Sequence, residues 1–596
     1  MAATATVAAL VEGRCAARPS AVAVESPDGA TATYADLRDR IARIAAALGP
    51  PPAASPDGPF PHGTVAVDLP SGLDFCAAVI AVLARGAALF AVDRTQPRAR
   101  LAAMLGIVAP EIVITGGPGG TAADLAPGAR TVDVAALPDA PPGPGPSFAT
   151  PAPGGDAPAY VVFTSGSTGV PKATVNTHAG LLNHLVFMGV VCPLPEDGRV
   201  LLKSARSFDA WLLEFFWALT QGRTLVLADE ERATDAQYLA DALATRSIHG
   251  FVCVPSLLRR VFSVLERTAG RTDLRVVVSA GEALRADLAT TVLTATNARL
   301  FNFYGPAEAA IDVAFHEVTG PPVDDPVPVG RPIPGNRLTV RDAAGADVTG
   351  SGRTGELVVT GDHVGLGYAG DAAATSAAFT TGPDGVRSYA TGDLAFLGPD
   401  RNFYLGGRMD TQVKINGVRI ETAEIEACLL RHKTVADCTV QVTTSGDVPV
   451  LVAFIKPEGD AEPLSEYINY LREKLPPVMV PPAYVFLNEF EYLPSGKKDT
   501  SKLVFPRGLP TVTAADFEEP AEGTERALAD IWEAVLGVAP VGATDEFALI
   551  GGDSLKLIDT LVKVSDSLYP DVFALGITRL STVRDLARKI EQAQGR

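Results

Sequence analysis

The sequence has few cysteines and no close cysteine pair. Six cysteines are scattered at positions 15, 76, 192, 253, 428 and 438 of 596 residues, and no CxxC occurs. Metal sites built on paired thiolates and disulfide frameworks both need closer or more regular spacing. Neither is therefore expected, and the chain fits a reducing compartment, for which we predict the cytoplasm.

Long apolar runs are also missing. No uncharged stretch approaches the length that crosses a bilayer. The first twenty residues begin apolar, but they lack a basic n-region and soon carry glutamate and arginine, unlike a signal peptide. We expect no membrane partner.

Positive charge is in deficit, with 50 Lys and Arg against 69 Asp and Glu and a formal net charge of −19. A general nucleic-acid binder carries a basic surface, so nucleic acid is not an expected partner. What the sequence does have is 47% hydrophobic and 20% charged residues, a globular composition. Because 596 residues exceed what one hydrophobic core supports, several domains are expected.

The first part of the chain alternates strands and helices. Between two loops rich in proline, glycine and alanine (49–63 and 137–158), the pattern predicts a strand over 64–68, a helix over 73–85 and a strand over 88–92. The alternation recurs over 199–228 and 237–280. Repeated strand–helix–strand units predict parallel sheets in a large α/β domain.

The pattern changes twice in the last third. A shorter α+β pattern runs from about 410 to 505, and a polar segment with two prolines follows. A helix is predicted from Thr524, and a second one from Ser554 has an apolar stripe of Leu557, Leu561, Val564 and Leu568. We predict domains at 1–409 and 410–506, a linker at 507–519, and an all-α domain at 520–596.

The most specific local signal is Tyr160–Lys172, YVVFTSGSTGVPK. An apolar strand enters a loop with hydroxyls, glycines and a lysine, which together suit phosphate oxygens. The spacing is wrong for a Walker A loop, and a plain Ser/Gly surface loop is the alternative.

This segment resembles the phosphate loop of the adenylate-forming superfamily, which includes acyl-CoA synthetases and the adenylation domains of nonribosomal peptide synthetases. Further motif matches follow in order: NFYGPAE at 302–308, YATGDL at 389–394, GRMDTQVKINGVRIE at 407–421 and SGK at 495–497. The resemblance implies a large multi-layer N-terminal domain and a smaller mobile α+β subdomain that turns about a hinge at Asp410.

The resemblance also implies site residues for ATP and Mg²⁺. Glu308 matches the residue that holds Mg²⁺, and Lys497 matches the lysine that bridges the substrate carboxylate and the phosphate. Residues matching the pyrophosphate-binding loop are Thr164, Ser165, Ser167, Thr168 and Lys172. Residues matching the adenosine contacts are Gly281, Glu282, Ala283, Asn302 and Tyr304 at adenine, with Asp393 and Arg408 at ribose.

Two positions depart from the family pattern. Ala307 stands where a threonine is usual, and Ala390 stands where an arginine is usual. Neither change removes a charge essential to the pattern, so an active enzyme is expected, with weaker nucleotide binding as the anticipated cost.

Phe547–Leu555 reads FALIGGDSL, in which a glycine turn leads to a serine at a helix N-terminus. That terminus favours a phosphodiester on Ser554, and the segment resembles the 4'-phosphopantetheine site of four-helix carrier domains. An ordinary glycine turn with a helix cap is the alternative.

The segment SFDAWLLEFF at 207–216 resembles the motif whose aspartate, here Asp209, receives the α-ammonium of an amino acid. A buried carboxylate needs such a cation, whereas a helix N-cap is the alternative role. The resemblance places nine residues around the substrate, with Lys497 at its carboxylate: Asp209, Ala210, Leu213, Val252, Val278, Ala280, Phe303, Ile311 and Asp312. This predicted lining is mostly apolar and favours a neutral side chain, such as tyrosine with its hydroxyl on Asp312; a hydroxylated or basic side chain is the runner-up.

We therefore expect ATP-dependent amino-acid activation followed by loading of the chain's own carrier, in nonribosomal peptide or antibiotic biosynthesis. An aryl- or fatty-acid ligase with a fused acyl carrier is the alternative, and a non-catalytic scaffold is a second rival. Expected partners are a phosphopantetheinyl transferase, a tailoring enzyme or condensation domain, and a small helper protein of the kind many relatives need.

Overall fold

The computed structural model divides the chain into two compact units. The first comprises residues 1–165, 170–412 and 416–419, and the second comprises 166–169, 413–415 and 420–596. The residues that the structure describes are 6–50, 63–117, 121–138, 155–166, 171–268, 270–348, 350–409, 412–415, 417–445, 448–459, 462–491, 498–503, 518–536, 541–545, 547, 554–575 and 581–594.

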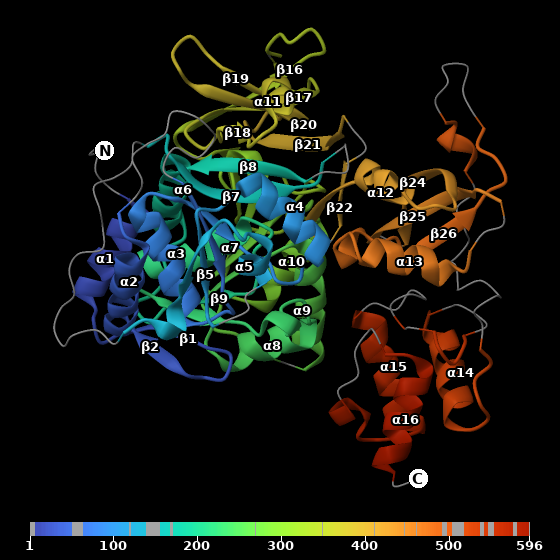
Figure 1. Ribbon diagram of the computed structural model, residues 1–596. Coiled ribbons are helices and arrows are strands. Elements are labelled where there is room, and N and C mark those ends of the chain that lie inside the picture. Colours follow the sequence, from blue (N-terminus) through green and yellow to red (C-terminus); the bar gives the residue numbers. More distant parts are fainter. Residues whose placement is uncertain are drawn as a thin grey trace. The chain divides into compact units, whose positions relative to one another are not determined.

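A nine-stranded sheet forms one half of the first unit (Figure 1), in the order β15-β14-β13-β12-β11-β9-β10-β1-β2. Its six central strands are parallel, and antiparallel strands flank them on both sides. The predicted parallel βαβ units over 199–280 are confirmed. The strands are β1 (Val22–Glu25), β2 (Thr31–Thr33), β9 (Arg199–Leu202), β10 (Thr224–Leu227), β11 (Gly250–Cys253), β12 (Val276–Ala280), β13 (Arg299–Tyr304), β14 (Ala314–Val318) and β15 (Arg331–Pro332).

A seven-stranded sheet forms the other half, in the order β18-β8-β7-β4-β3-β5-β6. The predicted strand at 64–68 and helix at 73–85 are confirmed as β3 and α3, and the strand predicted over 88–92 ends one residue earlier. The strands are β3 (Thr64–Asp68), β4 (Ala88–Ala91), β5 (Ile112–Thr115), β6 (Arg130–Asp133), β7 (Pro158–Thr164), β8 (Lys172–Thr177) and β18 (Gly367–Tyr368).

One apolar core joins both sheets to the helices between them. Val65 and Val67 of β3 belong to this core, whereas Ala66 points to a second cluster under α4 and α5. Burial on both faces explains why β3 is a continuous apolar run. Helices of the shared core are α1 (Val7–Ala17), α2 (Tyr34–Leu48), α3 (Leu73–Arg85), α6 (His178–Val191) and α7 (Ala210–Thr220).

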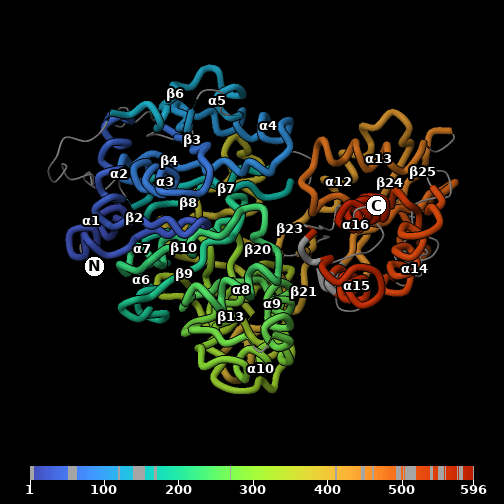
Figure 2. Tube along the Cα trace, turned by 90° about the horizontal axis from the view of Figure 1, so that it is seen from below, coloured from blue at the N-terminus to red at the C-terminus, as the bar shows by residue number. Residues whose placement is uncertain are grey.

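The outer layers are also helical, which makes the first unit a five-layer α/β/α/β/α stack (Figure 2). Helices α4 (Arg98–Val108) and α5 (Thr121–Leu125) cover the seven-stranded sheet. Helices α8 (Ala236–Thr245), α9 (Pro255–Arg267) and α10 (Ala286–Ala295) pack on one another and on β12 and β13. The predicted multi-layer α/β domain is confirmed.

A smaller antiparallel sheet completes the first unit. Its strands are β16 (Asn336–Arg341), β17 (Gly355–Gly361), β19 (Phe379–Thr381), β20 (Arg387–Leu397) and β21 (Phe403–Arg408), with α11 (Ala372–Ala378) beside them. Its apolar face, including Leu357 and Tyr389, shares a core with Tyr304 and Val313. This core fixes β20 and β21 against the carboxyl end of β13.

The second unit holds an α+β region and a helical region. In the α+β region β24 (Val435–Ser445) and β25 (Val448–Pro457) are antiparallel, and β26 (Ala483–Phe486) is parallel to β25. Helices α12 (Thr422–Leu429) and α13 (Leu464–Arg472) accompany them, and the hairpin β22 (Gln412–Ile415) and β23 (Val418–Glu421) precedes them. The predicted α+β subdomain is confirmed.

The helical region has its own core around Trp532 and Phe547. Helices α14 (Thr524–Leu536) and α15 (Ser554–Ser567) begin at the predicted residues, and α16 (Val583–Ala593) follows. Leu561 and Val564 of the predicted stripe are buried, and Leu557 and Leu568 pack against them. The other element described in this region is the 3₁₀ turn η6 (Val572–Leu575), which lies between α15 and α16 in the sequence.

Throughout the described part of the chain, no helix combines the length and apolarity needed to cross a membrane.

Candidate functional site

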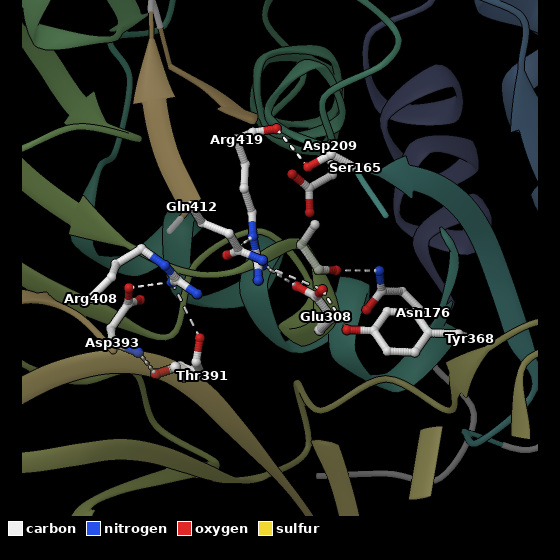
Figure 3. Close-up of polar contacts among 12 residues, drawn as sticks. Ser165, Asn176, Asp209, Glu308, Tyr368, Thr391, Asp393, Arg408, Gln412 and Arg419 are labelled. Carbon is white, nitrogen blue, oxygen red and sulfur yellow. Dashed lines mark hydrogen bonds and ion pairs between the residues drawn. The ribbon is translucent and has the colours of Figure 1, made fainter. Parts of the chain in front are cut away.

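Several predicted residues meet where β7 leads toward β8. Thr164 ends β7 and Ser165 follows it, both buried, while Lys172 opens β8. The Ser165 hydroxyl donates to the backbone carbonyl of Arg419 at 3.1 Å (Figure 3). The Lys172 ammonium lies 5.2 Å from the centre of the Tyr368 ring. Ser167 and Thr168 lie outside the described residues.

Glu308 lies in the short turn η3 (Ala307–Ala309) and is 1% exposed. The Tyr368 hydroxyl donates to one of its carboxylate oxygens at 2.8 Å, and Arg419 Nη1 lies 3.1 Å from the other (Figure 3). Arg419 also donates to the Gln412 side chain at 2.7 Å. Burial alone would lower the pKa of Arg419, but the nearby groups, chiefly the Glu308 carboxylate, together have the larger effect. The pKa is therefore raised well above its ordinary value, and the guanidinium stays charged.

A strained turn follows Glu308. Ala310 and Ile311 have φ values of 42° and 76°, a region that side chains other than glycine seldom adopt. The buried Asn176 side chain holds this turn, because it donates to the Ala307 carbonyl at 2.8 Å and accepts from the Ala310 N–H at 3.1 Å. Gly305 makes room: a Cβ there would lie 2.4 Å from the Asp312 Cα.

The strained turn delivers a donor to Asp209. The Ile311 N–H donates to Asp209 Oδ2 at 3.2 Å. Asp209 does occupy the N-cap position of α7, but its side chain caps no N–H of that helix. Burial raises the pKa of Asp209 to about 6, and the nearby Glu308 carboxylate adds to the rise. The Asp209 carboxylate therefore does not act as a helix cap.

The predicted substrate lining converges on one face of the nine-stranded sheet. Val252 is the register partner of Val278, and Ala280 is the register partner of Phe303. Because parallel neighbours share a face and residues two apart share a face, all four point to the same side. Leu213 of α7 and Ile311 pack in the same core, and Ala210 begins α7 one residue after Asp209.

Asp312 lies behind this lining and is 3% exposed. Its carboxylate is 3.8 Å from Nε2 of His184 on α6, and its backbone carbonyl contacts Nδ1 of His363 at 2.8 Å. Both histidines are fully buried.

Asp393 and Arg408 are register partners on β20 and β21. Asp393 accepts from Arg408 Nη1 and from the Tyr304 hydroxyl, both at 2.5 Å. Arg408 also donates to the Thr391 carbonyl at 3.3 Å (Figure 3). The structure thus joins three predicted nucleotide residues into one buried cluster.

Other predicted adenine residues have structural contacts of their own. The Asn302 amide donates to the carbonyls of Val327 and Pro328 at 3.3 and 2.9 Å. Glu282 accepts from Ser256 and from the Gly417 N–H, the latter at 2.7 Å. Gly281 has a φ of 86°, and Ala283 is exposed.

Three predicted positions are outside or at the margin of what is described. Asp410 and Lys497 lie outside the described residues. Ser554 is the first residue of α15, as the helix-terminus prediction requires of its backbone.

Sequence reasoning did not single out five residues that the structure brings to these groups: Asn176, His184, His363, Tyr368 and Arg419. Arg419 falls inside a quoted motif, which was a usable signal. The others carry no local pattern, because each acts across more than fifty residues of sequence.

Known protein families match three parts of the chain. The AMP-binding enzyme family matches residues 11–369, its C-terminal domain family matches 424–497, and the phosphopantetheine attachment site family matches 526–590. Phosphinothricin tripeptide synthetase PhsB of Streptomyces viridochromogenes is 35% identical over 98% of this chain and 49% of its own length. Tyrocidine synthase 3 of Brevibacillus parabrevis is 36% identical over 73% of this chain and 7% of its own. The chain thus spans half or less of these relatives.

Among solved structures, holo-PA1221, described as a nonribosomal peptide synthetase protein with adenylation and carrier domains, has a TM-score of 0.77. It is 26% identical, with 98% of this chain and 96% of that chain covered. The four-domain synthetase AB3403, bound to AMP and glycine, has a TM-score of 0.58 at 26% identity and covers 99% of this chain and 43% of that one.

Proposed function

This chain belongs to the nonribosomal peptide synthetases, as an AMP-binding adenylation domain with its C-terminal subdomain and a phosphopantetheine carrier domain, and on that premise we propose its specific reactions. It is an adenylate-forming ligase, of the kind that activates amino acids and loads them onto a carrier domain. We propose that it forms an aminoacyl-AMP from ATP and transfers the aminoacyl group to the phosphopantetheine thiol on its own Ser554.

Asp209 is the observation that carries the amino-acid part of the proposal. Its carboxylate accepts from the backbone N–H of Ile311, and no cation among the described residues pairs with it. A buried carboxylate without a cation is costly. The α-ammonium of an amino acid supplies that cation, whereas an aryl or fatty acid does not. This favours amino-acid activation over the aryl- or fatty-acid alternative.

In the first half-reaction an oxygen of the amino-acid carboxylate bonds to the α-phosphorus of ATP, and the bond to the pyrophosphate oxygen breaks. Anionic groups must approach one another, so the work is positioning and charge neutralisation. We assign Lys172, Thr164 and Ser165 to the departing pyrophosphate, supported by their common place at the β7–β8 junction. Ser167, Thr168 and Lys497 keep the roles that the resemblance gives them.

The residues present fit a Mg²⁺ ion at Glu308. Mg²⁺ is held by one or two carboxylates together with water and substrate phosphates, so a single buried carboxylate beside the phosphate loop suffices. Bound there, the ion would neutralise phosphate charge. Because Arg419 contacts the same carboxylate, its guanidinium must share Glu308 or leave it when the ion binds.

For the nucleotide we propose that Asp393 accepts the ribose hydroxyls, with Arg408 beside it. Two carboxylate oxygens provide about four acceptor sites, so the Arg408 and Tyr304 donors leave room for the sugar. Tyr304, Asn302 and the 281–283 segment would surround adenine.

The second half-reaction moves the acyl group to sulfur: the thiol sulfur bonds to the acyl carbon, AMP leaves, and the thiol proton is released. Tethering makes this step intramolecular, with an effective concentration on the order of mM. Asp410 is the proposed hinge that exchanges Lys497 for the thiol.

We propose a neutral amino acid of medium or large size, such as tyrosine, as substrate. A hydroxylated side chain, or a basic one neutralised by Asp312, is the second candidate. A tailoring enzyme or condensation domain then uses the loaded carrier, and a small helper protein assists solubility or activity.

Intact-mass spectrometry tests these steps together. The full chain is treated with a phosphopantetheinyl transferase and coenzyme A, then with ATP, Mg²⁺ and mixed amino acids. We expect a phosphopantetheine adduct followed by one aminoacyl adduct, both absent in Ser554→Ala, which still supports amino-acid-dependent pyrophosphate exchange. Loading by amine-free acids alone would overturn the amino-acid assignment.

A further inference from the structure

Two histidines and a tyrosine are buried around Asp312, and the proposed reactions use none of them. His184 and His363 are 0% exposed and Tyr160 is 2% exposed. The two imidazole rings are 5.8 Å apart between centroids in an edge-to-face arrangement. They come from α6 and from the loop after β17, whereas Tyr160 is on β7. Four separate segments, including that of Asp312, therefore bring polar groups to one buried place.

His363 presents a hydrogen-bond acceptor. Its Nδ1 lies 2.8 Å from the Asp312 carbonyl oxygen, which can only accept, so Nδ1 carries the hydrogen. Burial lowers the pKa of His363 to about 4, so the ring is neutral and Nε2 bears a lone pair. Nε2 is buried and has no hydrogen-bond partner among the described residues.

His184 presents both kinds of atom. It is neutral because burial, and His363 beside it, lower its pKa well below the ordinary value. Its ring therefore has one donor and one acceptor nitrogen, and neither makes a hydrogen bond within the described part of the chain. Nε2 lies 3.8 Å from the Asp312 carboxylate, beyond a hydrogen bond.

Helix α6 is held close to the substrate side of the unit. A Cβ on Gly180 would lie 3.0 Å from the Ala310 side chain and 3.3 Å from the His363 backbone. His184 is one turn further along the same helix face. Phe187, near His184 on that helix, contacts Phe303 of the predicted lining, with ring centroids 6.0 Å apart. The histidines thus adjoin the predicted side-chain end of the substrate.

Tyr160 connects the two ends of the proposed substrate. Burial raises its pKa well above the ordinary value, and the carboxylates of Asp209 and Asp312 both add to the rise, so its hydroxyl lies within electrostatic reach of each.

Folded proteins leave few buried polar atoms without partners, because each is costly. A cluster of them beside a binding site is explained if the ligand completes the hydrogen bonds. An apolar side chain would leave these atoms unpaired, and an acidic one would face both the Asp312 carboxylate and the His363 lone pair. A side chain that ends in a hydroxyl or an amine would satisfy them.

We propose that His184 and His363, with Asp312, form the specificity site for the tip of the substrate side chain and select amino acids that end in a hydrogen-bond donor. This inference rests on the proposed amino-acid activation and deepens it. Tyr160 completes the site between Asp312 and Asp209.

Pyrophosphate exchange with matched substrate pairs tests the proposal on the full chain. The pairs are tyrosine with phenylalanine, ornithine with norvaline, and lysine with norleucine. For the best pair we expect the donor-bearing member to have a kcat/KM higher by about tenfold to a hundredfold or more. In His184→Leu and His363→Leu that ratio should fall at least tenfold, mainly because KM for the apolar member decreases. His184→Gln, which keeps a donor and an acceptor, should retain part of the preference.

His249→Leu is the matched control. His249 is also buried, at 7% exposure, with an unpartnered Nδ1 among the described residues, but it precedes β11 at the amino end of the strand. It should leave the ratio unchanged, and thermal melting checks the folding of every variant. A loosened fold would raise KM for ATP as well and leave the ratio intact.

A wild-type preference for the apolar members, or an unchanged ratio in both folded histidine variants, would overturn the specificity site while amino-acid activation stands. If a folded chain shows no exchange with any amino acid but does with amine-free acids, the proposed function itself fails, and the specificity site with it.

Discussion

Two carboxylates of the first unit, Asp393 and Asp209, differ in the groups that the protein places around them before their proposed ligands bind. Asp393 is 7% exposed and already has a guanidinium and a phenol as donors, at 2.5 Å each. Asp209 accepts from the backbone N–H of Ile311 at 3.2 Å, has no cation among the described residues, and has a pKa raised by burial to about 6. The protein itself supplies a cation to Asp393, whereas Asp209 has none among the described residues.

The difference follows from what each ligand brings. The ribose hydroxyls proposed for Asp393 are neutral donors that bring no positive charge, and the Arg408 guanidinium supplies one within the protein. The α-ammonium of an amino acid is itself a cation, so a second cation at Asp209 would compete with it. The strain at Ala310 and Ile311 fits this division, because strained backbone persists where surrounding structure holds it for function.

The largest expected effect is that of Asp209→Asn. Losing the charge that pairs with the α-ammonium should lower kcat/KM for the amino acid on the order of a thousandfold in pyrophosphate exchange. The melting temperature should stay equal or rise, because the variant removes a buried carboxylate that has no cation in the free protein. A marked loss of stability would mean that Asp209 is structural instead.

Asp393→Asn should show the reverse combination. It removes the charge that Arg408 faces, so we expect a lower melting temperature, together with a KM for ATP raised by about tenfold to a hundredfold. Titration of ATP at saturating amino acid, and of amino acid at saturating ATP, separates the two variants. If either variant changed the KM values for ATP and for the amino acid equally, the two carboxylates could not be assigned to different substrates.

Local pattern was sufficient for much of the fold. Helix α3 and strand β3 were predicted to the residue, because apolar periodicity and the flanking loops mark their ends. The short 3₁₀ turn η6 was not predicted. Short elements carry too few periodic positions to be distinguished from turns.

Only those candidate site residues that lie within sequence motifs could be predicted from the sequence. Asp209, Glu308 and Asp393 came from motif matches, whereas His184 and His363 lie 179 residues apart and meet only in the folded unit. Nothing near either histidine signals the other. The strain at Ile311 was equally invisible, because a β-branched residue is a poor predictor of positive φ.

The pH dependence of amino-acid use should report Asp209. Its folded-state pKa of about 6 lies above the ordinary 3.8, so protonation below pH 6 removes the carboxylate that pairs with the ammonium. We expect kcat/KM for the amino acid to fall about tenfold per pH unit below 6. The same shift means that Asp209 makes folding less favourable as pH rises from about 4 to 6, since the folded state holds the proton more tightly.

The profile is measured by pyrophosphate exchange between pH 5 and 8 at saturating ATP. Asp209→Asn, followed at high amino-acid concentration, should lack the inflection near 6. An inflection that persists in this variant would assign the titration to another group and weaken the contrast with Asp393.

The smallest expected effect is that of Tyr304→Phe. The variant removes one donor from Asp393 but leaves the Arg408 pair, and the buried ring keeps its place in the core. We expect KM for ATP to rise about twofold to tenfold, with the amino-acid KM unchanged. The Arg408 contact to Asp393 remains in this variant, whereas Asp393→Asn replaces the carboxylate itself. An effect as large as that of Asp393→Asn would show that the phenol, and not the guanidinium, prepares this carboxylate for the sugar.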